Sequence, residues 1–315
     1  MATYILRRLS QTVVVLFLVS FLSFALLHLI PGDPVIAMLG AEAPKAQIEA
    51  LRSELWLDRP LIVQYLHWVG NALRGDFGKS VGLHEDVAKL VLSRLPVTFH
   101  IGAIALLLST FAAIPAGVVS AVRRGTFLDS AITVLANLGM AVPVFWLGIL
   151  GVYLFSLKLR WLPVQGYTSP FEDLWLNTKQ ILMPVLCMMV VPLASLTRQT
   201  RSSMLEVIRQ DYIVTARSKG LKERVIIARH ALKNAVIPVV TLLGIQLRYL
   251  VGGSVLVETV FNIPGIGRLL VRAVFEKDYL LVQGCILLIA VFVALANLAV
   301  DLSYGYFDPR VRHEA

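Results

Sequence analysis

The sequence has little charge and almost no cysteine. Only 16% of its 315 residues are charged, whereas 57% are apolar and the mean hydropathy is +0.75. This excess of apolar residues excludes an ordinary soluble globule and a disordered chain. The two cysteines, Cys187 and Cys285, each lie inside an apolar run, so they predict neither a disulfide framework nor a cysteine metal site.

Motifs for catalysis and for cofactor binding are also missing. The tripeptide Gly78–Ser80 resembles the end of a phosphate-binding loop, but Leu73 stands where that motif requires glycine. The pair His84–Glu85 opens a zinc-protease motif, but Ala88 replaces its second histidine. We therefore predict no catalytic residue, no metal site and no cofactor site in this chain.

Long apolar runs dominate what is present. A helix that crosses the hydrocarbon core of a membrane needs about 20 apolar residues, because each backbone polar group must be satisfied inside the segment. The sequence predicts an all-α integral membrane protein with six spans, the fourth being short and interrupted by two prolines. The expected spans are Thr12 to Ile30, Ile101 to Val122, Ala131 to Leu157, Ile181 to Leu196, Ala235 to Val257 and Leu280 to Tyr304.

Lysine and arginine set the expected orientation. Nine of the 29 basic residues lie between Arg198 and Lys233, in one segment between spans, and others flank the first, second and sixth spans. Because short cytoplasmic segments of membrane proteins are rich in Lys and Arg, we predict that both chain termini are cytoplasmic. The basic balance follows from this topology and from anionic lipids, so no nucleic-acid partner is inferred.

The regions between the spans suggest a domain division. We predict an anchor helix with an extracytoplasmic loop over residues 1–93, a membrane domain over 94–305 and a cytoplasmic tail over 306–315. The loop from Pro31 to His100 mixes both charges with aromatic residues, which favours an ordered elaboration rather than a linker.

The basic segment 198–234 is patterned as helix, turn, helix. Ser203 and Glu206 fit a capping box at a helix start, and Gly220 is placed to end that helix. A second helix is expected from Leu221 toward Pro238. A short amphipathic helix held between two spans can lie on lipid or dock into a soluble partner, and the pattern alone leaves both open.

Ionisable residues inside the expected spans are few. Arg248, near the middle of the fifth span, is a candidate contact for an anionic group of a substrate, although the residue pattern favours its pairing with a carboxylate or with carbonyls of a partner subunit. An ion-coupled transporter would need more intramembrane carboxylates, and a membrane-embedded enzyme would need a nucleophile, a base or a metal cluster. We keep both as alternatives.

The text of the basic segment resembles a known family. Residues 211–220 (Asp-Tyr-Ile-Val-Thr-Ala-Arg-Ser-Lys-Gly), followed by Arg229 to Ala235 and Pro238, resemble the EAA-type coupling loop of ABC importer permeases. The likeness is greatest to the first-permease subunit of the dipeptide/oligopeptide branch. It covers nearly the whole chain, through pieces such as Pro31 to Pro34, Gly75 to Gly78 and Asp308 to Arg310.

The resemblance implies a type I importer fold and a set of partners. It implies a bacterial or archaeal plasma membrane, a second and different permease subunit, two cytoplasmic ATPases that bind the ATP, and an external solute-binding protein. This chain would form half of the pathway for di- or oligopeptides and would hydrolyse nothing itself. Nickel chelates, glutathione or another small solute remain alternative substrates.

The resemblance also implies which residues contact an ATPase. Its coupling surface maps here to one short stretch: Asp211, Tyr212, Thr215, Ala216, Arg217, Lys219 and Gly220.

Overall fold

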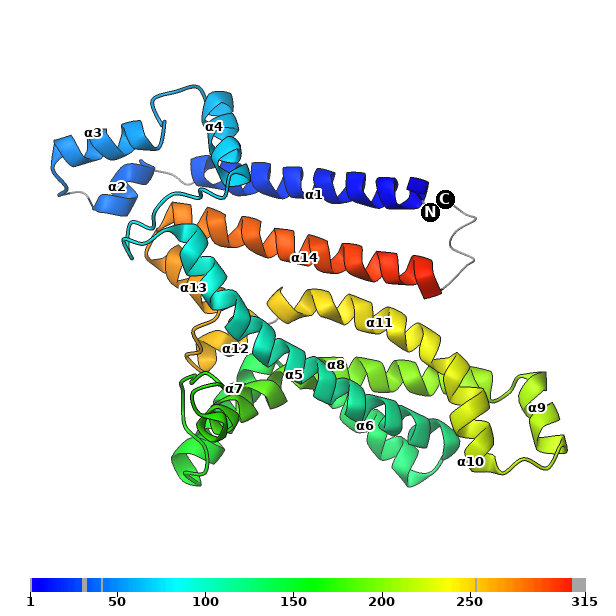
Figure 1. Ribbon diagram of the computed structural model, residues 1–315. Coiled ribbons are helices and arrows are strands. Elements are labelled where there is room, and N and C mark those ends of the chain that lie inside the picture. The colour runs from blue at the N-terminus through cyan, green and yellow to red at the C-terminus, as the bar shows by residue number, and fades with distance from the viewer. Residues whose placement is uncertain (1, 30–32, 41, 253, 308–315) are drawn as a thin grey trace. The chain divides into compact units, whose positions relative to one another are not determined.

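A computed structural model describes residues 2–29, 33–40, 42–252 and 254–307 of the chain (Figure 1). These residues form helices and turns, with one isolated bridge between Lys79 and Asp86 and no longer strand in the described part. The chain divides into two compact units, one comprising Met1–Thr98 with Pro264–Ala315 and the other Phe99–Ile263. The predicted domain boundary between residues 93 and 94 stays a prediction.

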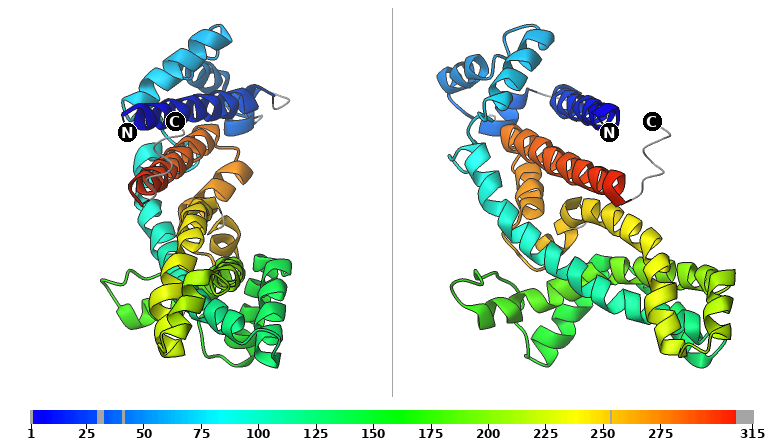
Figure 2. Two further views of the ribbon diagram at one scale, coloured as in Figure 1. Left: turned by 90° about the vertical axis from the view of Figure 1, so that its right-hand side faces the viewer. Right: turned by 45° about the vertical axis from the view of Figure 1, so that its right-hand side comes forward.

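Unit 1 contains the two ends of the chain. Its long helices α1 and α14 pack along each other, as both figures of the ribbon show (Figures 1 and 2). Three short helices follow α1, so the predicted loop 31–100 is a structured elaboration. The elements are α1 (Ala2–Leu29), α2 (Pro34–Leu39), α3 (Lys45–Glu54), α4 (Leu61–Leu73), α13 (Ile266–Phe275) and α14 (Tyr279–Phe307).

Unit 2 is built around one long helix, α8, which packs against α6, α7 and α11. Helix α5 (Val87–Val122) begins in unit 1 and ends in unit 2. The other elements are α6 (Phe127–Ala141), α7 (Val144–Gly151), η1 (Val152–Lys158), α8 (Leu174–Val207), α9 (Asp211–Ser218), α10 (Glu223–Val225), η2 (Ile226–Ala231), α11 (Leu232–Gly252) and α12 (Ser254–Val260).

The predicted membrane helices are present, with a correction to one of them. Five helices of the described part are long and apolar enough to cross a membrane. The expected third span is broken, because the helices on either side of Pro143 are bent by 97°. Val142 is extended there, as the residue before a proline usually is. The expected fifth span is occupied by α11, which ends at Gly252, and by α12, which begins at Ser254; residue 253 lies outside the described residues.

The prolines of the fourth span do not break it. Helix α8 contains both Pro184 and Pro192, is 34 residues long and reaches into the basic segment. The capping box predicted at Ser203 and Glu206 is therefore wrong, because Ser203 is a buried residue inside α8. The helix ends after Val207, and a tight turn leads to α9.

Candidate functional site

The short helix α9 is held on one apolar cluster at the end of unit 2. Ile213 and Ala216 point into the cluster and are 0% and 7% exposed. The cluster draws on the ends of α5, α8, η2 and α11. Its other buried members are Ala121, Met204, Ile226, Ala231 and Ala235. The face of α9 that carries Ile213 and Ala216, called the seat below, therefore packs against the ends of several long helices.

The opposite face of α9 is exposed. The aromatic Tyr212 is 42% exposed and the apolar Val214 is 53% exposed. The resemblance placed seven residues in a coupling surface, and the structure separates them: Ala216 is buried in the seat, and six are exposed. The exposed six are Asp211, Tyr212, Thr215, Arg217, Lys219 and Gly220.

Gly220 ends α9 as the sequence predicts. Its φ is +73°, a left-handed conformation that a residue with a Cβ adopts at a cost. The N–H of Gly220 donates to the carbonyl of Arg217, and the N–H of Leu221 donates to that of Ala216. These two bonds satisfy the last carbonyls of the helix in a Schellman arrangement.

Two polar contacts tie α9 to the chain that follows it. The side-chain amide of Asn234 in α11 donates to the Tyr212 hydroxyl at 2.7 Å. The guanidinium of Arg217 donates to both carboxylate oxygens of Glu223, at 3.3 and 2.8 Å. This hydrogen-bonded pair raises the pKa of Arg217 above its ordinary value. Arg217 thus holds the turn that follows α9.

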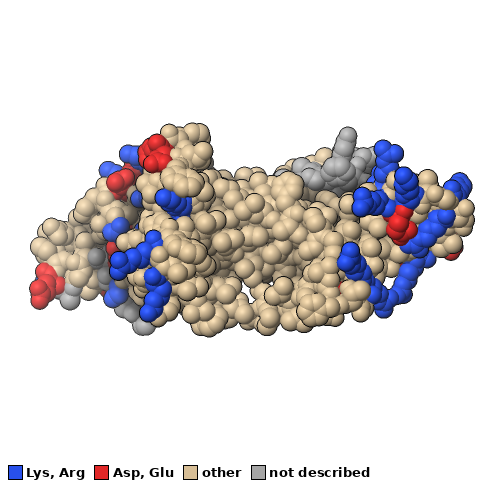
Figure 3. Space-filling view, turned by 90° about the horizontal axis from the view of Figure 1, so that it is seen from below, with Lys and Arg blue, Asp and Glu red and all other residues tan. Residues whose placement is uncertain are grey.

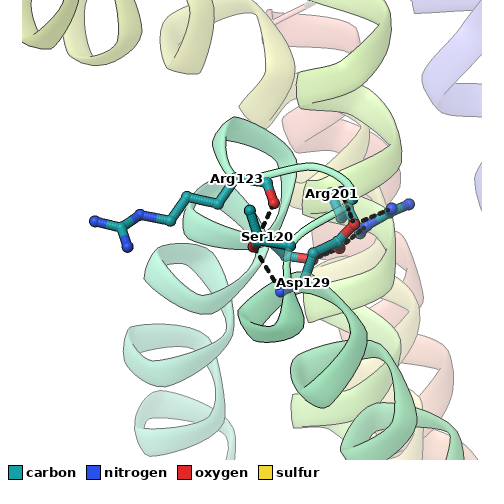
Figure 4. Close-up of polar contacts among 6 residues, drawn as sticks. Ser120, Arg123, Asp129 and Arg201 are labelled. Atoms are coloured by element: carbon teal, nitrogen blue, oxygen red, sulfur yellow. Dashed lines mark hydrogen bonds and ion pairs between the residues drawn. The ribbon is translucent and has the colours of Figure 1, made fainter.

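A second ion pair lies at the same end of unit 2. Asp129, in the first turn of α6, is 5% exposed. Arg201 of α8 donates to both of its oxygens, at 2.7 and 2.9 Å (Figure 4). Ser120 of α5 donates to the same carboxylate at 2.5 Å, and so does the backbone N–H of Gly125 at 3.0 Å. One carboxylate therefore fastens α5, α6 and α8 together.

Arg123 shows that not every arginine here takes part in this network. Its side chain points away from Asp129 (Figure 4), and its backbone carbonyl accepts from the Thr126 hydroxyl at 2.7 Å.

Close packing of α5 on α8 supports the Asp129 network. A Cβ at Gly117 would lie 2.5 Å from the Thr200 Cβ and 2.7 Å from the Thr197 carbonyl oxygen. Both distances are far below van der Waals contact, so only glycine allows the two helices to approach this closely. The crossing lies three residues before Ser120 and one residue before Arg201.

Basic residues surround this end of unit 2. Figure 3 shows Lys and Arg side chains gathered over the end that holds α9 and α10, beside a surface with little charge. Arg124 of the α5–α6 turn lies near Arg209, which follows α8, because both line one open hollow. The residues that line it are Arg124, Leu205, Glu206, Arg209 and Gln210.

Sequence reasoning did not identify Ser120, Asp129 or Arg201. Asp129 and Arg201 are 72 residues apart, and each looks like an ordinary charge at the end of an apolar run. Part of this network had a signal in the sequence, because Asp129 lies at the start of a helix. Arg201 lies inside α8, which the wrong capping box at Ser203 had divided. Arg248 lies in α11, but its side chain is outside the described part of the structure.

No metal or reactive centre is formed by these contacts. Within the described ranges, no group of three or more His, Cys, Asp or Glu residues lies close enough together to hold a metal ion. The arrangement can transmit movement: an exposed helix face is joined by an apolar seat and by ion pairs to the ends of long apolar helices.

Comparison with known families decides the class of protein. Residues 113–313 match the family described as "Binding-protein-dependent transport system inner membrane component". The chain belongs to this family. Residues 1–102 match the corresponding N-terminal family, so the two matches cover nearly the whole chain. The protein is therefore a multi-pass inner-membrane permease subunit of the ABC importer class, and the family predicted from the sequence is confirmed.

Similar proteins have been named in several bacteria. The chain is 42% identical over 313 residues to a probable peptide ABC transporter permease protein, y4tP, of Sinorhizobium fredii. The match covers 99% of this chain and 100% of the relative. It is 39% identical over 336 residues to the di/tripeptide transport system permease protein DppB of Pseudomonas aeruginosa, with 100% of both chains covered.

Solved structures show the same fold. The chain resembles the MetNI methionine ABC transporter in two crystal forms with inward-facing conformations, with TM-scores of 0.52 and 0.53. In both comparisons the identity is 18%, and 70% of this chain and 96% of the other are covered. At this identity the likeness establishes the fold of an importer permease and no more.

Proposed function

We propose that this permease subunit forms half of a peptide pathway and that α9 transmits ATPase movement to its spans. The observation that carries the proposal is the two-sided character of α9. Ile213 and Ala216 seat it on a cluster that includes Ala121 of α5 and Met204 of α8, whereas the face with Thr215 is exposed. A partner that displaced α9 would move the ends of several long helices together, as rigid packed elements do.

We place α9, the α5–α6 turn and both chain termini on the cytoplasmic side. Support comes from the nine basic residues between Arg198 and Lys233 and from the hollow that brings Arg124 beside Arg209. Positive charge of this kind is retained on the cytoplasmic side of bacterial inner membranes. The relatives are bacterial, which supports a bacterial inner membrane for this chain.

The family supports the following set of partners. The chain pairs with a second, different permease subunit, with two ATPase subunits that bind and hydrolyse ATP, and with an external solute-binding protein. The description "binding-protein-dependent" supports the last of these. This chain itself is a transport subunit that catalyses no reaction and binds no cofactor.

The substrates are di- and oligopeptides. Support comes from the relatives, two of which are named for peptide or di/tripeptide transport and match this chain along its whole length. Arg248 stays a predicted contact for an anionic group of the substrate.

Purification and uptake test the whole proposal. Tagged protein, purified in mild detergent from cells that also express the proposed partner subunits, is expected to carry a second permease and two ATPases. Proteoliposomes made from it should take up labelled dipeptides only when ATP and the binding protein are present. A chain that purifies alone and moves solute without ATP contradicts the proposal, and uptake of glutathione or a nickel chelate instead contradicts the peptide assignment.

Variants of α9 separate its seat from its surface. Thr215→Glu, on the exposed face, is expected to release the ATPase subunits and to leave the thermal unfolding midpoint unchanged. Ala216→Glu buries a charge in the apolar cluster and should lower that midpoint as well. Ser130→Glu, at an exposed position of α6 in the same unit, is the matched control and should retain the ATPases. Retention of the ATPases by Thr215→Glu would contradict the docking role of α9.

A further inference from the structure

Helix α4 of unit 1 exposes a continuous apolar face. Ile62, Leu66 and Leu73 are 75%, 63% and 84% exposed, and with the half-buried Val69 they follow steps of four, three and four residues. This spacing places the four side chains on one side of the helix. No charged residue lies within α4 itself. A helix face that borders water is normally polar, so this face is adapted to another environment.

The polar side chains of α4 lie on its other side and contact the chain's own backbone and rings. The side-chain amide of Gln64 donates to the carbonyl of Arg59 at 2.6 Å. The ring of His67 stacks on Trp56, with centroids 3.9 Å apart, and its Nε2 lies 3.4 Å from the Asn71 side-chain amide. The helix is therefore amphipathic, with its polar side covered by the segment that precedes it.

A third side of α4 is fixed to α1. The Tyr65 ring packs edge-on against Phe17, Phe21 and Phe24, with centroids 5.5 to 6.2 Å apart. Its hydroxyl lies 2.8 Å from the Ser20 hydroxyl. All four partners belong to residues Ile5–Ala25, which are long and apolar enough to cross a membrane. This contact sets α4 at the depth of the C-terminal half of the α1 span.

The length and direction of α4 exclude a span of its own. Its thirteen residues reach about 20 Å, shorter than the hydrocarbon core of about 30 Å. The ribbon views show α4 running across the end of α1 rather than along it (Figures 1 and 2). A helix at membrane depth that crosses a span lies along the plane of the bilayer.

We propose that α4 is an interfacial helix whose apolar face is inserted among the acyl chains of the leaflet nearest the C-terminal end of α1. Its amphipathic pattern is that of helices that lie in the boundary between headgroups and acyl chains. Exposed arginines, Arg59 and Arg74, flank the helix, where long cationic side chains reach lipid headgroups. The helix thereby braces the first span from the side and fixes its depth.

Quenching of a fluorophore attached to cysteine tests the proposal. Ile62→Cys and Leu66→Cys, labelled with bimane and assembled into lipid nanodiscs as the full chain, probe the apolar face. Gln47→Cys, at an exposed position of α3, is the matched control. The unlabelled blank is the wild type, because Cys187 and Cys285 are both buried. All three substitutions replace exposed residues, and an unchanged unfolding midpoint verifies the fold of each variant.

The two quenchers distinguish the environments. Phosphatidylcholine brominated on its acyl chains should quench bimane at positions 62 and 66 several-fold more than at position 47, and aqueous iodide should show the reverse order. Iodide quenching at 62 and 66 equal to that at 47 would overturn the proposal, because the face would then border water. Protection from both quenchers would overturn it too, because a protein partner would then cover the face.

Discussion

Two ion pairs fasten the same end of unit 2, and they differ in their surroundings. Each joins an arginine to both oxygens of one carboxylate. Asp129 and Arg201 are 72 residues apart in sequence, with side chains 7% and 29% exposed, and the carboxylate also accepts from Ser120 and the backbone. Arg217 and Glu223 are six residues apart, with side chains 44% and 53% exposed.

The difference teaches that similar chemistry serves two purposes. An exposed ion pair contributes little to stability, because water screens it and solvates either partner alone. A buried charge that loses its partner is costly, because it cannot regain its hydration. The Asp129 pair therefore holds three long helices together, whereas the Arg217 pair shapes the turn that follows α9.

Removing the charge of Asp129 should have the largest effect. Asp129→Asn keeps the size of the side chain but leaves Arg201 without a counter-charge, so we expect a loss of about 3 kcal/mol in the free energy of unfolding. Thermal unfolding of the purified protein in detergent measures it. A loss no greater than that of Arg217→Ala would contradict the comparison.

A double variant sharpens this prediction. Asp129→Asn combined with Arg201→Gln removes both charges, so it should be more stable than Asp129→Asn alone, since no unpaired charge remains. If the double variant loses as much free energy of unfolding as the sum of what Asp129→Asn and Arg201→Gln lose separately, Asp129 does not act through Arg201.

Gly220→Val should have the next largest effect, a loss of about 1–2 kcal/mol in the free energy of unfolding, because valine is strained at a φ of +73°. The strain shifts the end of α9, so we expect uptake to be lost while the protein still inserts in the membrane at its normal level. Uptake assays and membrane immunoblots measure these two properties. Gly220→Asn is the control, since asparagine tolerates this conformation. Normal uptake by the valine variant would contradict the role of this turn.

Tyr212→Phe should have a smaller effect, about 1 kcal/mol, because it removes one hydrogen bond from Asn234 at a partly exposed site. Unfolding of Tyr212→Phe, Asn234→Ala and the double variant forms a complete cycle. The double variant should lose less than the sum of the two single losses. Exact additivity would show that the two side chains do not stabilise α9 through each other.

Breaking the exposed ion pair should have the smallest effect on stability. Arg217→Ala and Glu223→Ala should each lose less than about 1 kcal/mol. Raising the salt concentration should reduce the difference in free energy of unfolding between each variant and the wild type, because salt screens exposed charges. A salt-independent loss of several kcal/mol would place this pair in the same class as the Asp129 pair.

The long helices and the end of α9 could be predicted from the sequence. Apolar runs of membrane length indicate helices because an unpaired backbone group is costly in lipid, and this holds for the spans in α1, α5, α8 and α14. Gly220 ends α9 because of its own conformational freedom, which is a local property. Local signals failed where neighbouring elements decide. Pro143 coincides with a bend of 97°, whereas Pro184 and Pro192 lie within a continuous helix.

By itself the sequence determined that the protein is helical, that it belongs in a membrane, which family it resembles and where its basic segment lies. These conclusions follow from properties of short stretches: apolar length, charge and residue order. Only the tertiary structure decided that Ala216 faces inward, that Asp129 binds Arg201 and that Tyr65 holds α4 against α1. Such pairings depend on which side chains the packed helices bring within a few ångströms, and no distance along the chain specifies that.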